Sequence, residues 1–136
     1  MALVGAVHHV ALTVTDLDKS VTWYRELFEL AGLMEEEHGD GRAVILADPE
    51  AGLYLGLHAH DGNPGESFRE VHTGLDHLSF SVSSREDLEK WEARLAERGV
   101  TYSPISDQPW GSIVAFRDPD DIQLELTAPP SANAHH

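Results

Sequence analysis

The stretch VHHVALTV, residues 7–14, decides the fold because a stretch of the same pattern recurs later in the chain. HHVALTV, which begins at His8, matches DHLSFSV, which begins at Asp76, and this match places His9 on His77. In both copies apolar and polar side chains alternate, a pattern typical of a β-strand with one buried face. The two copies indicate that the chain consists of two similar halves.

The match extends well beyond this strand. VILADP (44–49) matches VAFRDP (114–119), and an alternating apolar run follows each Asp-Pro pair. The two repeats therefore cover residues 7–60 and 75–127, and the glycine-rich, charged segment 61–74 is the predicted linker. We expect residues 128–136 to form a flexible tail and the whole chain, 1–136, to be a single domain made of the two repeats.

A helix is predicted after the first strand of each repeat. The first helix has Gly32 as its expected C-terminal cap, and its apolar face consists of Leu17, Val21, Tyr24 and Phe28. In the second repeat, Ser83 and Glu86 have the spacing of a capping box, and Gly99 ends the helix.

Each repeat reads as a βαβββ unit, in which a strand at 7–14 or 75–82 is followed by the helix and by the strands around the Asp-Pro turn. The helix covers one apolar face of each sheet and leaves the other face open. The predicted fold class is therefore α+β, with two βαβββ repeats whose sheets curve around a shared cleft.

Strand alternation also predicts which side chains face this cleft. The large apolar residues of each strand must face the helix, so His9 and His77 are expected on the open side. In the last strand Leu124 and Leu126 form the core set, which puts Glu125 on the opposite face. Two histidines and one glutamate thus come from strands that face one cleft.

Composition excludes several classes of protein. The chain has no cysteine, which rules out a thiolate metal site, and its 24 acidic and 9 basic residues give a formal net charge of -15. Such a field repels nucleic acid and anionic membranes. No apolar run approaches the roughly 20 residues of a membrane span, and no signal-peptide pattern is present. We expect a soluble, cytoplasmic protein.

The chain resembles the vicinal oxygen chelate superfamily, which includes glyoxalase I, fosfomycin-modifying enzymes, extradiol dioxygenases and bleomycin-resistance proteins. The resemblance covers residues 7–127 and is carried by HHVALTVTDLDKSVTWYRELFEL, LDHLSFSV and FRDPDDIQLEL. It implies metal ligands on the first and last strands of each unit, which assigns this role to His9, His77 and Glu125. Imidazole and carboxylate ligands suit a divalent ion of Fe, Mn, Ni, Co or Zn.

A fourth ligand position of the family falls on Gly56, which has no side chain to coordinate a metal. His58 shares the strand face of Gly56 and would replace the missing ligand if the strand slipped or bulged. Otherwise His58 lines the cleft together with Tyr54, and these two residues are our candidates for catalytic groups. Trp110, Gly56 and Gln123 are expected to line the substrate site.

Two functions follow from the resemblance. One is a small metal-dependent enzyme, of the lyase, ring-opening transferase or dioxygenase type, that binds an oxygenated small molecule on its metal. The other is a non-catalytic, drug-sequestering protein of the bleomycin-resistance type. The presence of all three ligands favours the enzyme. The resemblance also implies a homodimer, with each cleft built within one chain or across two.

Overall fold

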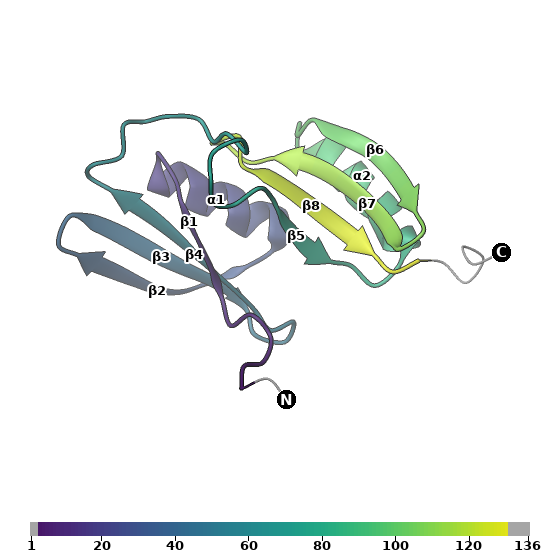
Figure 1. Ribbon diagram of the computed structural model, residues 1–136, viewed down its shortest axis with the longest axis horizontal. Helices are drawn as coiled ribbons and strands as arrows, with labels where there is room; N and C mark the ends of the chain where they lie inside the picture. The colour runs from purple at the N-terminus through teal and green to yellow at the C-terminus, as the bar shows by residue number, and fades with distance from the viewer. Residues whose placement is uncertain (1–2, 131–136) are drawn as a thin grey trace. The chain divides into compact units, whose positions relative to one another are not determined.

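The sequence repeat is a repeat of secondary-structure elements, as the ribbon of the computed structural model shows (Figure 1). The structure describes residues 3–130. They divide into an N-terminal unit, which extends to Glu66, and a C-terminal unit, which begins at Ser67. The elements of the N-terminal unit are β1 (Val10–Thr13), α1 (Leu17–Phe28), β2 (Ala31–His38), β3 (Gly41–Asp48) and β4 (Leu53–His60). Those of the C-terminal unit are β5 (Leu78–Ser81), α2 (Arg85–Glu97), β6 (Tyr102–Gln108), β7 (Gly111–Arg117) and β8 (Gln123–Ala128).

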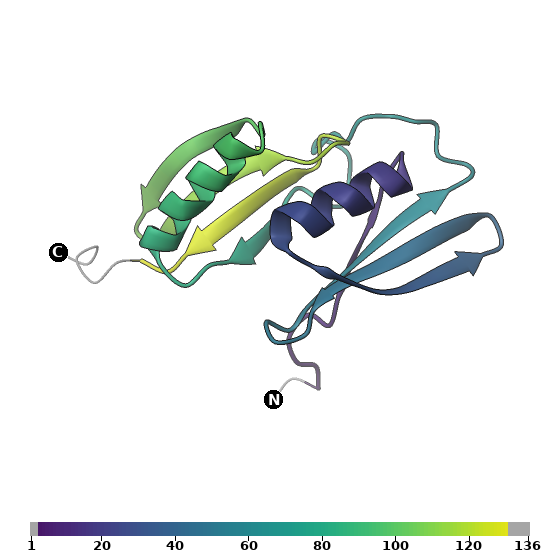
Figure 2. The same cartoon turned by 180° about the vertical axis from the view of Figure 1, so that it is seen from behind.

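Both sheets have the same topology, which confirms the predicted α+β class and the βαβββ units. The strand orders are β1-β4-β3-β2 and β5-β8-β7-β6. In each unit the first strand pairs in parallel with the last strand, and the other pairs are antiparallel. Figure 2 shows that α1 lies over one face of the first sheet and α2 over one face of the second.

Burial follows the predicted strand alternation. Leu12 in β1 and both Leu124 and Leu126 in β8 are buried, whereas Thr13 is exposed and Glu125 is only partly covered. The buried helix positions are Leu17, Ser20, Tyr24 and Leu27 in α1 and Leu88 and Leu95 in α2. The covered face of α1 is thus centred closer to Ser20 and Leu27 than to the predicted Val21 and Phe28, which are half-buried.

The first strands are shorter than predicted. The strand expected at 7–14 is paired only over Val10–Thr13, and the one expected at 75–82 only over Leu78–Ser81. His9 and His77 therefore lie one residue before β1 and β5. Sequence alternation continues past the last ladder hydrogen bond, which is why it overestimates the strand length.

Two predicted helix caps are wrong. Gly32 lies in β2, opposite Leu46, because Glu29 itself adopts the left-handed conformation (φ 54°) and ends α1 with a hydrogen bond from its N–H to the Arg25 carbonyl. The N-cap of α2 is Ser84 rather than Ser83, since the Ser84 hydroxyl accepts a hydrogen bond from the Asp87 N–H. The predicted end at Gly99 is confirmed, because Gly99 has φ 71° and follows α2 directly after Arg98.

The segment between the two sheets and the C-terminal residues complete the chain. Within the predicted linker 61–74, the Phe68 N–H donates to the Asp120 carbonyl, and Glu70 forms an ion pair with Arg117. Of the predicted tail 128–136, Ala128 ends β8, and residues 131–136 lie outside the described residues. No helix among residues 3–130 has the length and apolar character needed to cross a membrane.

Candidate functional site

His77 and Glu125 come together in the C-terminal unit. β5 pairs with β8 so that Ser79 lies opposite Glu125, and His77 precedes Ser79 by two residues, on the same face of the strand. The His77 Nε2 atom lies 3.7 Å from Glu125 Oε1. The Glu125 side chain is 13% exposed and that of His77 43%, so the pair is reachable from solvent.

Each of these two side chains is held by a second residue. The His77 Nδ1–H donates to Asp76 Oδ1 at 2.8 Å, which directs Nε2 toward Glu125. The Gln123 amide donates to Glu125 Oε2 at 2.9 Å and accepts a hydrogen bond from Arg117 at 3.2 Å. The two atoms that face each other are therefore fixed by contacts on their far sides, as is usual for metal-binding histidines and carboxylates.

The protonation of His77 reflects these neighbours. The hydrogen bond to the Asp76 carboxylate raises the pKa of His77 above its usual value, and the charge of Glu125 adds to this against the opposing effect of partial burial. Any metal ion bound by Nε2 must displace a proton that two carboxylates stabilise.

His9 lies in the N-terminal unit, where His8 takes the place that Asp76 has beside His77. The Nδ1 atoms of His8 and His9 are 2.8 Å apart, so one ring donates a hydrogen bond to the other. The His8 ring also stacks on Tyr54, with ring centroids 6.1 Å apart. Sequence reasoning gave His8 no role. The match of His8 to Asp76 in the repeat is the signal that identifies it.

Gly56, at the fourth ligand position, is overlaid by His58. The pairing of β4 with β1 and β3 is continuous around Gly56, without the slip or bulge that would bring His58 into register. Instead, the imidazole itself reaches back along the strand, since a Cβ atom added to Gly56 would lie 3.4 Å from His58 Nε2. Because Gly56 has no side chain, the His58 ring can occupy the space above it.

His58 also contacts histidines on its other side. Its Nδ1 atom lies 3.4 Å from His38 Nε2 at the end of β2. Partial burial lowers the pKa of His58, and the charges that His38 and His60 carry when protonated lower it further. His58 is therefore held in its neutral form, which can accept a proton.

The remaining predicted site residues lie in different settings. Trp110 is at the turn between β6 and β7 and is 60% exposed. Gln123 is half-buried beside Glu125, and Tyr54 is half-buried beneath His8. Sequence reasoning missed His38 and Asp40 entirely, because only the hairpin register of β2, β3 and β4 places them near His58 and His60.

Comparison with known proteins identifies a matching family model and several similar proteins. A family model described as Glyoxalase/Bleomycin resistance protein/Dioxygenase superfamily matches residues 6–126. The solved glyoxylase/bleomycin resistance protein/dioxygenase domain from Frankia sp. EAN1pec is 41% identical, with a TM-score of 0.87 and 98% of each chain covered. The uncharacterized protein YwkD of Bacillus subtilis (strain 168) is 30% identical over 91% of this chain and 97% of its own. The metallothiol transferase FosB of Shouchella clausii (strain KSM-K16) is 27% identical over 91% of this chain and 80% of its own.

Proposed function

The chain belongs to the glyoxalase/bleomycin resistance/dioxygenase superfamily, and from this premise we propose that it is a small metal-dependent enzyme. In this proposal His9, His77 and Glu125 hold one divalent ion, and an oxygenated small molecule is the substrate. The FosB relative, named a metallothiol transferase, supports a metal-dependent reaction.

The observation that carries the proposal is the approach of His77 Nε2 to Glu125 Oε1 at 3.7 Å. Two ligand atoms bound to one ion at about 2.0–2.2 Å lie about 3–4 Å apart, so this pair fits a common ion with little movement. Asp76 and Gln123 already occupy the far sides of the two ligands. The two nearest atoms are too far apart for a direct hydrogen bond, which leaves room for an ion between them.

Support for His9 as the third ligand comes from the repeat. His9 matches His77 in sequence, lies one residue before the equivalent strand, and has its Nδ1 atom engaged by the preceding residue in the same way. This contact leaves Nε2 as the nitrogen that can coordinate an ion.

A divalent ion at these three ligands supplies Lewis-acid stabilisation of negative charge that develops on a substrate oxygen. The protein's own contribution to proton transfer is assigned to His58, whose ring lies above Gly56 and can accept a proton in its neutral form. Tyr54, packed against His8, helps to fix the His8–His9 pair.

Metal content tests the proposal. The protein is purified without metal-affinity steps, with His135→Ala and His136→Ala in every sample because terminal imidazoles also bind transition metals. We expect the parent to retain a divalent ion, and the His77→Ala and Glu125→Ala variants each to retain about one ion per chain less. His72→Ala, which changes an exposed histidine of the linker segment, is the matched control and should leave the content unchanged.

Equal metal content in the parent and both variants would contradict the proposal of a metal-dependent enzyme. The drug-sequestering alternative would then be tested by titration with a cationic glycopeptide, followed through tryptophan fluorescence.

A further inference from the structure

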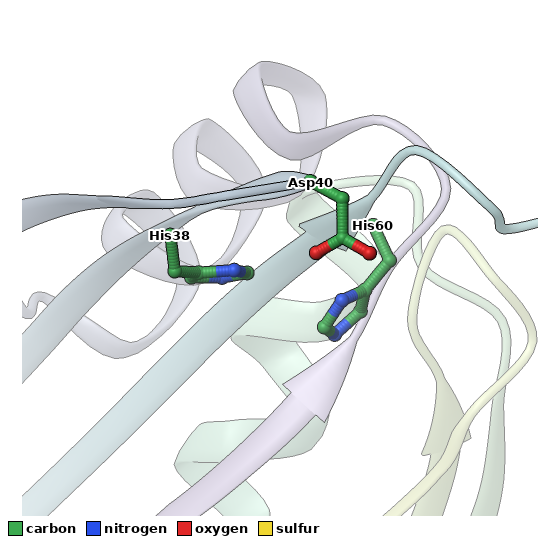
Figure 3. A group of neighbouring side chains, drawn as sticks. All are labelled: His38, Asp40 and His60. Carbon is green, nitrogen blue, oxygen red and sulfur yellow. The ribbon is translucent and has the colours of Figure 1, made fainter.

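A second group of metal-ligating side chains lies at one end of the sheet of the N-terminal unit. His38 ends β2, Asp40 lies in the tight turn to β3, and His60 ends β4. Figure 3 shows these three side chains directed toward a common region beside the turn. None of them belongs to the proposed centre at His9, His77 and Glu125.

The backbone fixes the positions of all three residues. β2 and β3 pair so that His38 lies opposite Gly41, and β3 and β4 pair so that Gly41 lies opposite His60. The Asp61 N–H donates to the Asp40 carbonyl at 2.8 Å and ties the turn to the end of β4. The cluster therefore lies at one end of three paired strands, which hold ligands more rigidly than a free loop does.

Gly41 provides the space that the His38 ring occupies. A Cβ atom at Gly41 would lie 2.6 Å from His38 Cε1 and would collide with the Ala59 carbonyl oxygen. A side chain at this position would require the His38 ring and the Ala59 backbone to shift. The absence of a side chain at the centre of the cluster thus allows its members to approach one another.

The spacing of the ligand atoms suits a single ion. One nitrogen of each histidine and one carboxylate oxygen of Asp40 all lie within 4.8 Å of one another. Ligands of a tetrahedral ion with bonds of about 2.0–2.1 Å are about 3.3 Å apart, so modest side-chain rotations complete the geometry. His58 Nδ1, which is 3.4 Å from His38 Nε2, brings a further imidazole nitrogen to this spacing.

The charges around the cluster favour a cation. Glu35, Glu36 and Glu37 precede His38 and are exposed, and the chain as a whole carries a formal net charge of -15. Arg42, the neighbouring base, pairs with Asp18 at 3.3 Å. Among the described residues 3–130, no arginine or lysine forms an ion pair with the Asp40 carboxylate.

We propose that His38, Asp40 and His60 form a second metal site, which binds a divalent transition ion with the preferences of Zn²⁺. Two imidazoles and one carboxylate without a thiol match this class of ion. Asp40 and His60 are exposed, so the ion can enter directly from solvent and retains a position open to water.

The test is calorimetric titration with Zn²⁺ in a background that lacks the other candidate ligands, namely His77→Ala, Glu125→Ala, His135→Ala and His136→Ala. Asp40→Asn with His60→Gln removes the proposed ligands. Asp121→Asn with His72→Gln makes the same chemical changes at exposed positions of the C-terminal unit, outside the cluster, and is the matched control. Thermal unfolding of each metal-free protein checks that the fold is retained.

We expect one Zn²⁺ ion to bind in the background and in the control, and binding to weaken at least about tenfold in Asp40→Asn/His60→Gln, since even outer partners of a metal contribute that much. Equal affinity in the control and in Asp40→Asn/His60→Gln would overturn the second site. The first site is tested separately, because its failure appears as unchanged metal content on His77→Ala and Glu125→Ala.

Discussion

At the scale of single residues, the two repeats orient equivalent histidines with different neighbouring side chains. The Nδ1 atom of His77 is engaged by a carboxylate, Asp76, whereas that of His9 is engaged by an imidazole, His8. Both contacts orient the ring. They differ in charge, since the hydrogen bond and the negative charge of Asp76 raise the pKa of His77.

This difference gives a direct prediction for Asp76→Ala. Because the hydrogen bond from His77 to Asp76 is the largest cause of the raised pKa of His77, its removal should lower that pKa in the metal-free protein. The imidazolium of the variant then loses its proton at a lower pH than that of the parent. Proton NMR titration of the His77 ring measures the change, with Asp61→Ala as a control. An unchanged or higher pKa in Asp76→Ala would show that Asp76 does not stabilise the imidazolium.

Strand alternation was sufficient to predict that His77 and Glu125 share a face, because side-chain direction in a strand depends only on position. The roles of His8, Asp76 and Gln123 could not be predicted in this way. Each depends on the rotamer that brings one polar atom to another across one or two residues, and sequence spacing does not determine rotamers.

At the scale of elements, the two Asp-Pro turns differ in the hydrogen bonds that their aspartates accept. Asp118 is 6% exposed, and its Oδ1 atom accepts hydrogen bonds from the Asp120 and Ile122 N–H groups, both at 2.8 Å. The equivalent Asp48 accepts one longer hydrogen bond, from the Ala51 N–H at 3.4 Å. The turn between β7 and β8 thus depends on its aspartate more than the turn between β3 and β4 does.

We therefore predict that Asp118→Ala lowers the free energy of unfolding by about 1–3 kcal/mol, because it leaves the N–H groups of Asp120 and of the buried Ile122 without their acceptor. Asp48→Ala, the matched change in the other repeat, should cost clearly less. Urea unfolding followed by circular dichroism compares the two variants. Equal losses would mean that the hydrogen bonds of Asp118 do not stabilise its turn.

Element order and sheet faces were predictable because hydrophobic alternation and glycine positions carry that information. The caps were less so. Ser83 and Ser84 each have an acidic residue three positions later, so the pattern alone cannot choose between them. The preference of glycine for the left-handed conformation predicts Gly32 as the cap, yet Glu29 adopts this conformation three residues earlier.

At the scale of the whole molecule, two βαβββ units each bring one ligand position to the residue before the first strand. The repeat made His9 and His77 recognisable as equivalents. The group at His38, Asp40 and His60 has no counterpart in the repeat match. It follows only from the register of β2, β3 and β4, in which the pairing of β2 with β3 shifts between Gly32 and Met34.

The central claim, that His9, His77 and Glu125 hold one divalent ion, is tested most directly by an anomalous difference map from crystals of the protein saturated with Zn²⁺. We predict a peak about 2.0–2.2 Å from His77 Nε2, from a Glu125 carboxylate oxygen and from His9 Nε2. A map with zinc bound elsewhere, and no peak between His77 and Glu125, would contradict the claim.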